Sequence, residues 1–246
     1  MKRRNLIVGL GAGFLAGCSK VGKSDPMQSL FKLAEDWHRG AHRALAGKRG
    51  LAQEFTKADI SPFFRGNGTT DPGDAAYTAH AATGFAGWTI AVTGLVDRPL
   101  ELTLEQIKAL PQRTQITRHD CVEGWSAIGE WTGPQLGTML DLAGVQPNAN
   151  YVVFRCADVL NGSAYYESVD MVDAYHPQTI VAHALNGAPL PVANGAPLRM
   201  RIERQLGYKS AKYVTAIEAV ESLDGIHGGK GGYWEDRSDY QWYAGA

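Results

Sequence analysis

The sequence of 246 residues lacks several patterns that define common classes of site. Its three cysteines form no C-x-x-C pair, which disfavours a zinc cluster, and no C-x-x-C-H motif, so we expect no attached haem. The formal net charge of -1 leaves no basic surplus, and we therefore expect no nucleic-acid partner. The glycines, although abundant, follow no fixed period, which argues against a repeat protein. The N-terminal apolar run is too short to span a bilayer as a stable anchor.

The N-terminal stretch MKRRNLIVGLGAGFLAGCSK allows two interpretations. The glycines of GLGAG resemble a dinucleotide-binding turn, but the helix, strand and acidic residue that this turn needs do not follow. The favoured interpretation is an export signal, because Lys2, Arg3 and Arg4 precede a short apolar run that ends in small residues. The paired arginines resemble a twin-arginine signal, and LAGC resembles a lipobox that would attach a lipid to Cys18. We expect a periplasmic protein that meets the membrane only through this anchor or a partner.

Four segments are expected along the chain. They are a signal at 1–18, a linker with an amphipathic helix at 19–59, a folded domain at 60–225 and an aromatic, glycine-rich tail at 226–246. Apolar residues three and four positions apart predict the helix over 26–46. The stretch 56–84 is rich in Gly, Pro, Asp and Thr and is expected to be an irregular loop.

Strands outnumber helices in the expected domain. Short helices are predicted after Thr103, which forms a capping box with Gln106, from Thr132 to Ala143, and after Asp170. The tail is too irregular to form an element by itself. Strands are predicted at 87–99, 113–120, 151–157, 163–169, on both sides of a turn at 186–187, and at 211–223. Because strands and helices do not alternate regularly, we expect an α+β fold with a mixed, β-dominated core.

Cys121 lies within RHDCVEGWSAIGEWTG, beside charged residues and tryptophans. Four roles are open for it: a packed thiol, half of a disulfide with Cys156, a nucleophile or a metal ligand. Arg118 and His119 would lower the pKa of a nearby thiol, which suits a nucleophile or a metal ligand. An oxidising compartment favours the disulfide. His119 could serve as a base for Cys121 or be a hydrogen-bonded structural histidine.

A resemblance narrows these choices. CVEGW followed by W-x-G-x-x-L, from Cys121 to Leu136, is similar to the cofactor-binding segment of the sulfite oxidase family of molybdopterin oxidoreductases. In this family the cysteine is the protein ligand of molybdenum. A soft thiolate suits such a metal, together with the two sulfurs of the pterin. The resemblance implies a sulfite-oxidase-type fold, a molybdenum–molybdopterin cofactor and Cys121 as a catalytic ligand.

Other motifs follow in the order of the family and imply further site residues. NGAPLR and LGYKSAK resemble its second pterin-binding segment, and FFRGNGT resembles a degraded form of its Phe-x-Arg-Asn-His loop. A second tyrosine in SAYYES is implied as a substrate-side hydroxyl, and Cys156 falls near a position that can contact the cofactor. Implied cofactor-binding residues are Arg65, Asn67, Cys121, Cys156, Asn194, Arg199, Ser210, Ala211 and Lys212, with Tyr166 as a catalytic residue.

The resemblance also implies oxygen-atom transfer with a small sulfur-containing substrate and a separate electron-transfer protein such as a cytochrome. Four arginines could form an anion-attracting pocket, which favours sulfite or a related oxyanion; they are Arg118, Arg155, Arg201 and Arg204. Reduction of oxidised methionine is the alternative activity. Two further hypotheses are a ligand-binding lipoprotein without enzymatic activity and a hydrolase with Cys121 as its nucleophile. The tail could cover the cofactor, form a partner surface or simply pack.

Overall fold

The computed structural model describes residues 24–47 and 50–245. The chain divides into two compact units, Met1–Gly47 and Lys48–Ala246. The expected export signal and lipobox lie outside the described residues. The second unit begins before residue 60, where the folded domain was expected, because residues near 54 pair with its sheet: Phe55 N donates to Ile116 O at 2.8 Å.

The predicted amphipathic helix is α2, Asp25–Ala46. Pro26 stands in its first turn, where a missing N–H costs nothing. Leu30, Leu33 and Trp37 share one face and are exposed. Among the described residues no helix is long and apolar enough to cross a bilayer.

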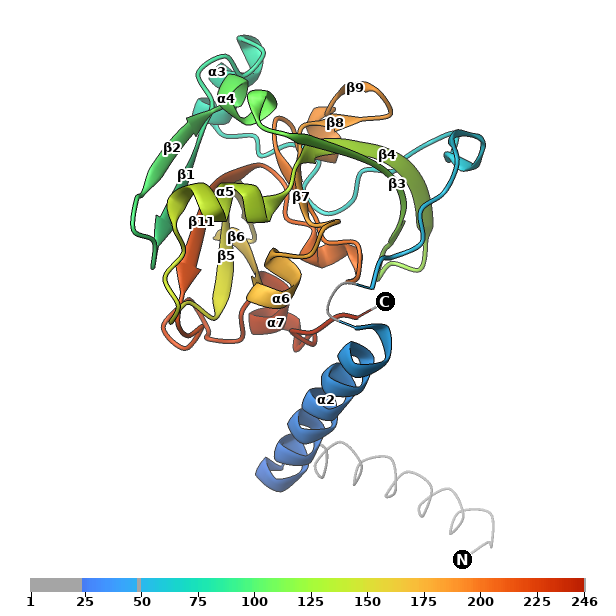
Figure 1. The fold of residues 1–246 in the computed structure, drawn as a ribbon, viewed down its shortest axis with the longest axis vertical. Coiled ribbons are helices and arrows are strands. Elements are labelled where there is room, and N and C mark those ends of the chain that lie inside the picture. Colours follow the sequence, from blue (N-terminus) through green and yellow to red (C-terminus); the bar gives the residue numbers. More distant parts are fainter. Residues whose placement is uncertain (1–23, 48–49, 246) are drawn as a thin grey trace, which may run out of the picture. The chain divides into compact units, whose positions relative to one another are not determined.

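A five-stranded sheet forms one side of the second unit (Figure 1). Its strand order is β2-β1-β11-β5-β6. The pair β1–β11 is parallel and the other pairs are antiparallel, so the sheet is mixed. The strands are β1 (Thr89–Gly94), β2 (Leu100–Thr103), β5 (Tyr151–Leu160), β6 (Ser163–Asp170) and β11 (Val214–Val220).

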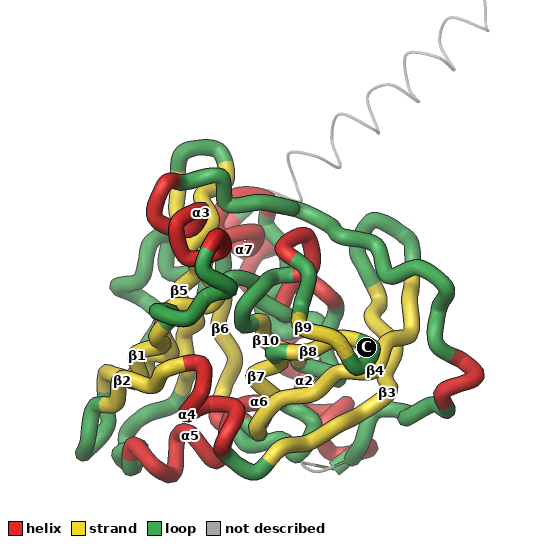
Figure 2. Tube along the Cα trace, turned by 90° about the horizontal axis from the view of Figure 1, so that it is seen from above, coloured by secondary structure: helices red, strands yellow, loops and turns green. Residues whose placement is uncertain are grey.

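Two smaller sheets complete the strand framework. Figure 2 shows β7 to β10 between the five-stranded sheet and the long β3–β4 hairpin. One sheet has the order β3-β4-β8-β9, and the other pairs β10 with β7. The strands are β3 (Gln112–Asp120), β4 (Ser126–Pro134), β7 (Ile180–Ala182), β8 (Ala184–Leu185), β9 (Ala188–Pro189) and β10 (Arg199–Arg201). The expected mixed, strand-rich α+β class is confirmed.

Helices are short in the second unit. They are α3 (Ala75–Ala82), α4 (Leu104–Ala109), α5 (Leu136–Ala143), α6 (Met171–Ala174) and α7 (Tyr233–Ser238), with 3-10 turns η1 (Lys57–Asp59), η2 (Val192–Asn194) and η3 (Gly207–Lys209). The capping box of Thr103 and Gln106 is present, and Asp170 caps α6 through Asp173 N. Both predicted caps are confirmed.

Three expectations for local structure are wrong. The stretch 56–84 contains η1 and α3, the latter capped by Asp74, which accepts from Tyr77 N at 2.8 Å. Thr132 and Pro134 belong to β4, because pairing with β3 outweighs their helix-starting pattern, and α5 begins only at Leu136. The tail contains α7, which packs on the domain.

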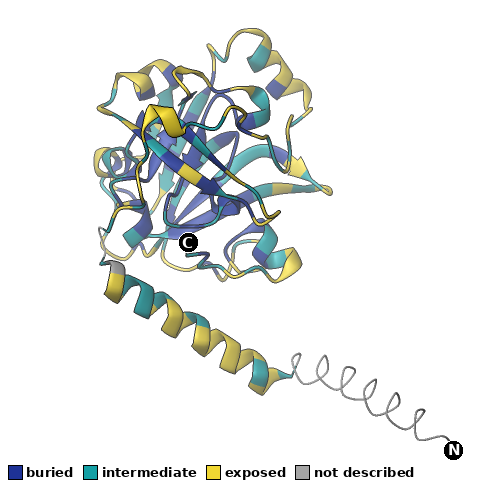
Figure 3. Cartoon of the chain, turned by 90° about the vertical axis from the view of Figure 1, so that its right-hand side faces the viewer, coloured by how far each residue is buried: buried dark blue, intermediate teal, exposed yellow. Residues whose placement is uncertain are grey.

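The core fills the space between the five-stranded sheet and the helices that cover it. Figure 3 shows the buried residues gathered in the strands of the second unit. Val152 and Phe154 of β5, Ile217 of β11 and Leu140 of α5 are fully buried in one cluster. This rigid framework ends at the β3–β4 turn and at the loops before β10 and β11, where the sequence motifs lie.

Candidate active site

One pocket brings together six of the residues that the sequence motifs imply. These residues are Asn67, Cys121, Arg199, Ser210, Ala211 and Lys212. The pocket holds about 740 Å³ of empty space, open solvent at its mouth included. The six residues come from three separate segments, so the fold assembles the site from motifs that are distant in sequence.

Cys121 stands at the tight turn between β3 and β4. Its N–H donates to Trp125 O at 2.9 Å, and its carbonyl accepts from Gly124 N at 3.0 Å, which fixes the backbone. The Sγ atom lies 3.7 Å from Asn67 Nδ2, which donates to it. The side chain is 8% exposed and faces the pocket. The turn therefore holds one thiol at a fixed place in the pocket wall.

The pKa of Cys121 is raised, not lowered as the neighbouring sequence suggests. Burial is the main cause, and Arg65 and Asn67 oppose it only in part. Arg118 does not supply a positive charge to the thiol, because its guanidinium pairs with Asp120 at 2.9 Å. A thiol that stays protonated is a poor nucleophile, whereas a bound metal removes its proton directly. The geometry favours the metal-ligand role over the nucleophile.

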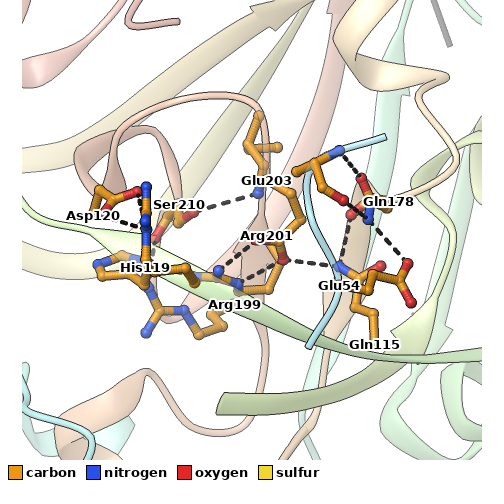
Figure 4. A network of polar contacts seen from close by, with 12 residues as sticks. Glu54, Gln115, His119, Asp120, Gln178, Arg199, Arg201, Glu203 and Ser210 are labelled. Carbon is orange, nitrogen blue, oxygen red and sulfur yellow. Dashed lines mark hydrogen bonds and ion pairs between the residues drawn. The ribbon is translucent and has the colours of Figure 1, made fainter. Parts of the chain in front are cut away.

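His119 is a structural residue in this arrangement. Its Nδ1 accepts from Arg201 Nη1 at 2.7 Å, and Arg201 also forms an ion pair with Glu203 at 2.6 Å (Figure 4). Burial and nearby cations hold the pKa of His119 well below its ordinary range. Since its Nδ1 is occupied by Arg201, the expected alternative of a base for Cys121 has no support.

The disulfide alternative for Cys121 is wrong. Cys121 and Cys156 are both free thiols. Cys156 lies on β5 opposite Val214, and burial raises the pKa of its thiol. Cys121 is therefore available as a ligand.

Two buried cations also line the pocket, Arg199 and Lys212. Arg199 is 1% exposed, and it donates to the backbone carbonyls of Asn194 at 3.0 Å and Ser210 at 3.3 Å. Lys212 Nζ donates to three backbone carbonyls, Asn67 O at 2.6 Å among them. Burial, with the charge of Arg201, lowers the pKa of Arg199 to about 9, and burial, with the charge of Arg199, lowers the pKa of Lys212 to about 7. Neither cation forms an ion pair with a carboxylate among the described residues.

The donor set fits a cofactor with an anionic end and a soft metal. The buried Nε of Arg199 has no hydrogen-bond partner in the described part of the chain, so one donor of the guanidinium remains available. Gly195 has φ +106°, and a Cβ there would lie 2.9 Å from Lys212 Cγ and 3.1 Å from Arg199 Cβ. Buried cations without counter-ions are costly, and a bound phosphate would remove this cost. Arg199 and Lys212 would hold that end, and Cys121 would bind the metal.

The other predicted site residues lie beside the pocket. Asn194 donates from Nδ2 to Phe64 O at 3.5 Å and supports Arg199 through its own carbonyl. The exposed Arg65 places its guanidinium 5.7 Å from the ring of Trp125. Neither Asn194 nor Arg65 is among the residues that line the pocket.

The structure corrects the prediction for Tyr166. Successive side chains of a strand point to opposite faces, so Tyr166 and Tyr165 on β6 diverge. Tyr166 donates to the carboxylate of Asp236 and stacks on His227, whereas Tyr165 lines the pocket. Of the two tyrosines, Tyr165 is therefore the one at the pocket, and its OH donates to Tyr208 O at 3.0 Å.

The expected anion pocket of four arginines is also wrong. Each arginine pairs with a carboxylate: Arg118 with Asp120, Arg155 with Glu218, Arg201 with Glu203 and Arg204 with Asp173. None of the four is among the lining residues. Their charges are satisfied within the fold.

Several lining residues were not predicted from the sequence. They are Gly68, Thr69, Val122, Glu123, Asp158, Leu160, Tyr165, Gly207, Tyr208, Trp234 and Tyr240. Strand alternation could have distinguished Tyr165 from Tyr166. The aromatic composition of the tail raised a cofactor-covering role as one alternative, but not which of its residues line the pocket.

One further pair of potential metal ligands lies on α2. His38 and His42 of α2 have the spacing of a two-histidine pair, with ring centroids 4.9 Å apart. Nowhere in residues 24–47 and 50–245 do three His, Cys, Asp or Glu side chains gather into an ion-binding group.

The pocket joins one thiol to two buried cations that form no ion pair among the described residues, as the sequence motifs imply for a molybdopterin site. Comparison with known proteins agrees. The family described as "Oxidoreductase molybdopterin binding domain" matches residues 78–224, more than half of the chain. The chain belongs to this family, which confirms the expected sulfite oxidase relationship.

Individual relatives are named for sulfoxide reduction. The chain is 44% identical over 161 residues to the "Putative protein-methionine-sulfoxide reductase subunit YedZ1" of Azospira oryzae, covering 65% of this chain and 57% of that one. It is 32% identical over 225 residues to the "Protein-methionine-sulfoxide reductase catalytic subunit MsrP" of Xanthomonas axonopodis pv. citri, covering 85% and 66%. The chain thus spans between about half and two thirds of these relatives.

A solved structure shares the fold. The sulfane dehydrogenase SoxCD of Paracoccus pantotrophus matches with a TM-score of 0.53 and 21% identity, covering 62% of this chain and 41% of that chain. At this identity the likeness concerns the fold alone.

Proposed function

We propose that this chain is a molybdopterin-dependent sulfoxide reductase with oxidised methionine as its substrate class. The observation that carries the proposal is the charge of the pocket wall. Arg199 and Lys212 are placed to hold the cofactor, and the other charged lining residues are Glu123 and Asp158. The described lining offers no further cation that would attract sulfite, whereas a neutral sulfoxide needs none.

The names of the relatives support the same substrate class, oxidised methionine. Sulfite was the favoured substrate on the sequence alone, with oxidised methionine as the alternative. The arginines that favoured sulfite are paired elsewhere, and both relatives are named for methionine sulfoxide. The alternative is therefore the better supported substrate.

The cofactor, when bound, supplies a molybdenum centre that accepts an oxygen atom and exchanges two electrons. Reduction of a sulfoxide consumes two electrons and two protons, breaks the S–O bond and releases a sulfide and water. Cys121 fixes the metal at the pocket wall, and Asn67 donates to its sulfur. A separate electron-transfer protein such as a cytochrome would supply the electrons.

We expect loaded protein with a reduced artificial donor such as benzyl viologen to reduce methionine sulfoxide. Because the described lining has no cation beyond those placed to hold the cofactor, sulfite gains no electrostatic attraction, and kcat/KM for the sulfoxide should exceed that for sulfite oxidation by at least about tenfold. Viologen oxidation and ferricyanide reduction measure the two directions. Sulfite oxidation without sulfoxide reduction would contradict the proposal.

We also propose twin-arginine export and lipid attachment at Cys18, on the basis of the sequence of residues 1–18. With Arg3 and Arg4 both replaced by lysine, unprocessed protein should stay in the cytoplasm. Cys18→Ala should yield soluble exported protein that still contains molybdenum. Cell fractionation with metal analysis measures both, and normal export of the double-lysine form would argue against this route.

A further inference from the structure

The C-terminal segment 226–245 is fastened to the domain through a fully buried group of charges. Lys209 Nζ lies 2.7 Å from Glu167 Oε2 on β6 and 2.5 Å from Glu235 Oε1 on α7. All three side chains have no exposed surface. Breaking a buried ion pair is strongly unfavourable, so this group fixes α7 in place.

Close backbone packing makes room for this group. At Gly232 a Cβ would collide with the carboxylates of both Glu235 and Glu167. Asp236 accepts from Gly228 N at 2.9 Å and Lys230 N at 3.0 Å, which folds the glycine-rich loop onto α7. The glycines of GGKGG are therefore needed for the segment to return to the domain.

Further contacts hold the end of the segment. Trp242 Nε1 donates to Ser168 Oγ at 2.8 Å, and Leu206 N donates to Ala244 O at 2.8 Å. Tyr208 OH, from the pocket wall, donates to Gln241 O at 2.6 Å. The segment is thus attached along its length and not at a single point.

The attached segment places two aromatic rings in the pocket wall. Trp234 and Tyr240 both line the pocket, and their rings stack with centroids 5.7 Å apart. Tyr240 also meets Tyr208 edge to face at 5.1 Å. Because these rings face the pocket and one another, the segment resembles a wall of the cofactor site more than a surface for a protein partner.

We propose that residues 226–245 form a retaining cover for the pterin cofactor, in which Trp234 and Tyr240 are additional binding residues and the Lys209–Glu167–Glu235 group holds the cover closed. The proposal rests on membership of the molybdopterin-binding family and not on the substrate. The cofactor would enter with this cover displaced, and its closure would then slow the loss of the cofactor.

Cys121 gives a direct measure of closure, since it lines the same pocket. In cofactor-free protein from a host unable to make the pterin, we expect the closed cover to slow maleimide alkylation of Cys121. Trp234→Ala with Tyr240→Ala should raise this rate at least about tenfold, as should Glu235→Ala, which changes a side chain that is not among the lining residues. Mass spectrometry of the labelled peptide separates Cys121 from Cys156.

Two control variants distinguish opening of the cover from general loosening of the domain. Glu235→Gln retains a hydrogen-bonding side chain and leaves the Lys209–Glu167 pair, so its rate should remain near that of the wild type. Ser238→Ala changes an exposed side chain of the same helix and should also leave the rate unchanged. An equal rise in Ser238→Ala would show general loosening and overturn the proposal.

A second measurement uses protein that already holds its cofactor. Pterin fluorescence released on dilution should appear faster in Trp234→Ala with Tyr240→Ala and in Glu235→Ala than in the wild type. If Cys121 of the unaltered protein reacts as fast as in the variants, or if neither measurement changes, the segment is not a cover. Neither measurement depends on turnover, so failure here would leave the proposed sulfoxide reductase activity untouched.

Discussion

Replacing Cys121 with serine is expected to abolish turnover while most of the cofactor stays bound. The thiol is the soft donor that the β3–β4 turn presents to the pocket, and a hydroxyl is a hard donor that ionises far less readily. On the proposed assignment, Arg199 and Lys212 would hold the anionic end of the cofactor without help from this sulfur. Because even changes outside the ligand shell cost about 10–100-fold, kcat should fall by at least about 100-fold.

Molybdenum analysis and electron paramagnetic resonance would distinguish this outcome from a loss of folding. The Cys121→Ser protein should keep much of its molybdenum, with a signal altered by the loss of one sulfur donor. Cys156→Ser is the matched control, since Cys156 is a free thiol on β5 outside the lining residues. A native metal signal in Cys121→Ser, together with full turnover, would refute the ligand role.

The sequence was sufficient for the parts of the site that lie in contiguous motifs. Cys121 and the segment from Ser210 to Lys212 reach the pocket because each lies in a turn or loop directly beside a strand. In such places the local backbone determines where the side chains point. The mixed sheet was likewise predictable, because its strands are β-rich runs bounded by turn residues.

Features that depend on partners distant in sequence were not predictable. The raised pKa of the Cys121 thiol follows from burial, and the neighbouring Arg118 is neutralised by Asp120. A covering role was among the alternatives for the tail, but its attachment was not predictable, because Glu235 meets Lys209 only in the folded chain. A linear pattern shows which charges exist, but folding decides which of them remain without a counter-ion.

Removing the two pocket cations, Arg199 and Lys212, is expected to cause the second large effect, a loss of bound cofactor. Removing a charge-assisted hydrogen-bond partner typically costs about 1.5–3 kcal/mol. Arg199→Met and Lys212→Met should therefore each lower cofactor affinity by about 10–100-fold, and together they should leave little molybdenum in the purified protein. Arg155→Ala, which removes a cation paired with Glu218 outside the pocket lining, is the matched control and should retain full occupancy.

The pKa of Lys212 provides an independent check on cofactor-free protein. Folding lowers this pKa to about 7, so between its ordinary value near 10.5 and pH 7 the unfolded chain binds a proton that the folded chain does not. Stability contributed by this group therefore falls as the pH drops through that window and is constant below it. Lys212→Met should lose this dependence in denaturant titrations.

Sulfate, which stays divalent throughout, can serve as a stand-in for the anionic end of the cofactor. It should raise the unfolding temperature of the cofactor-free protein more at pH 6, where Lys212 is charged, than at pH 9, where it is neutral. The Arg199→Met, Lys212→Met double variant should show no such difference, whereas Arg155→Ala should behave as the wild type. Full molybdenum content in the double variant, or an equal sulfate response at both pH values, would show that these cations do not hold the cofactor.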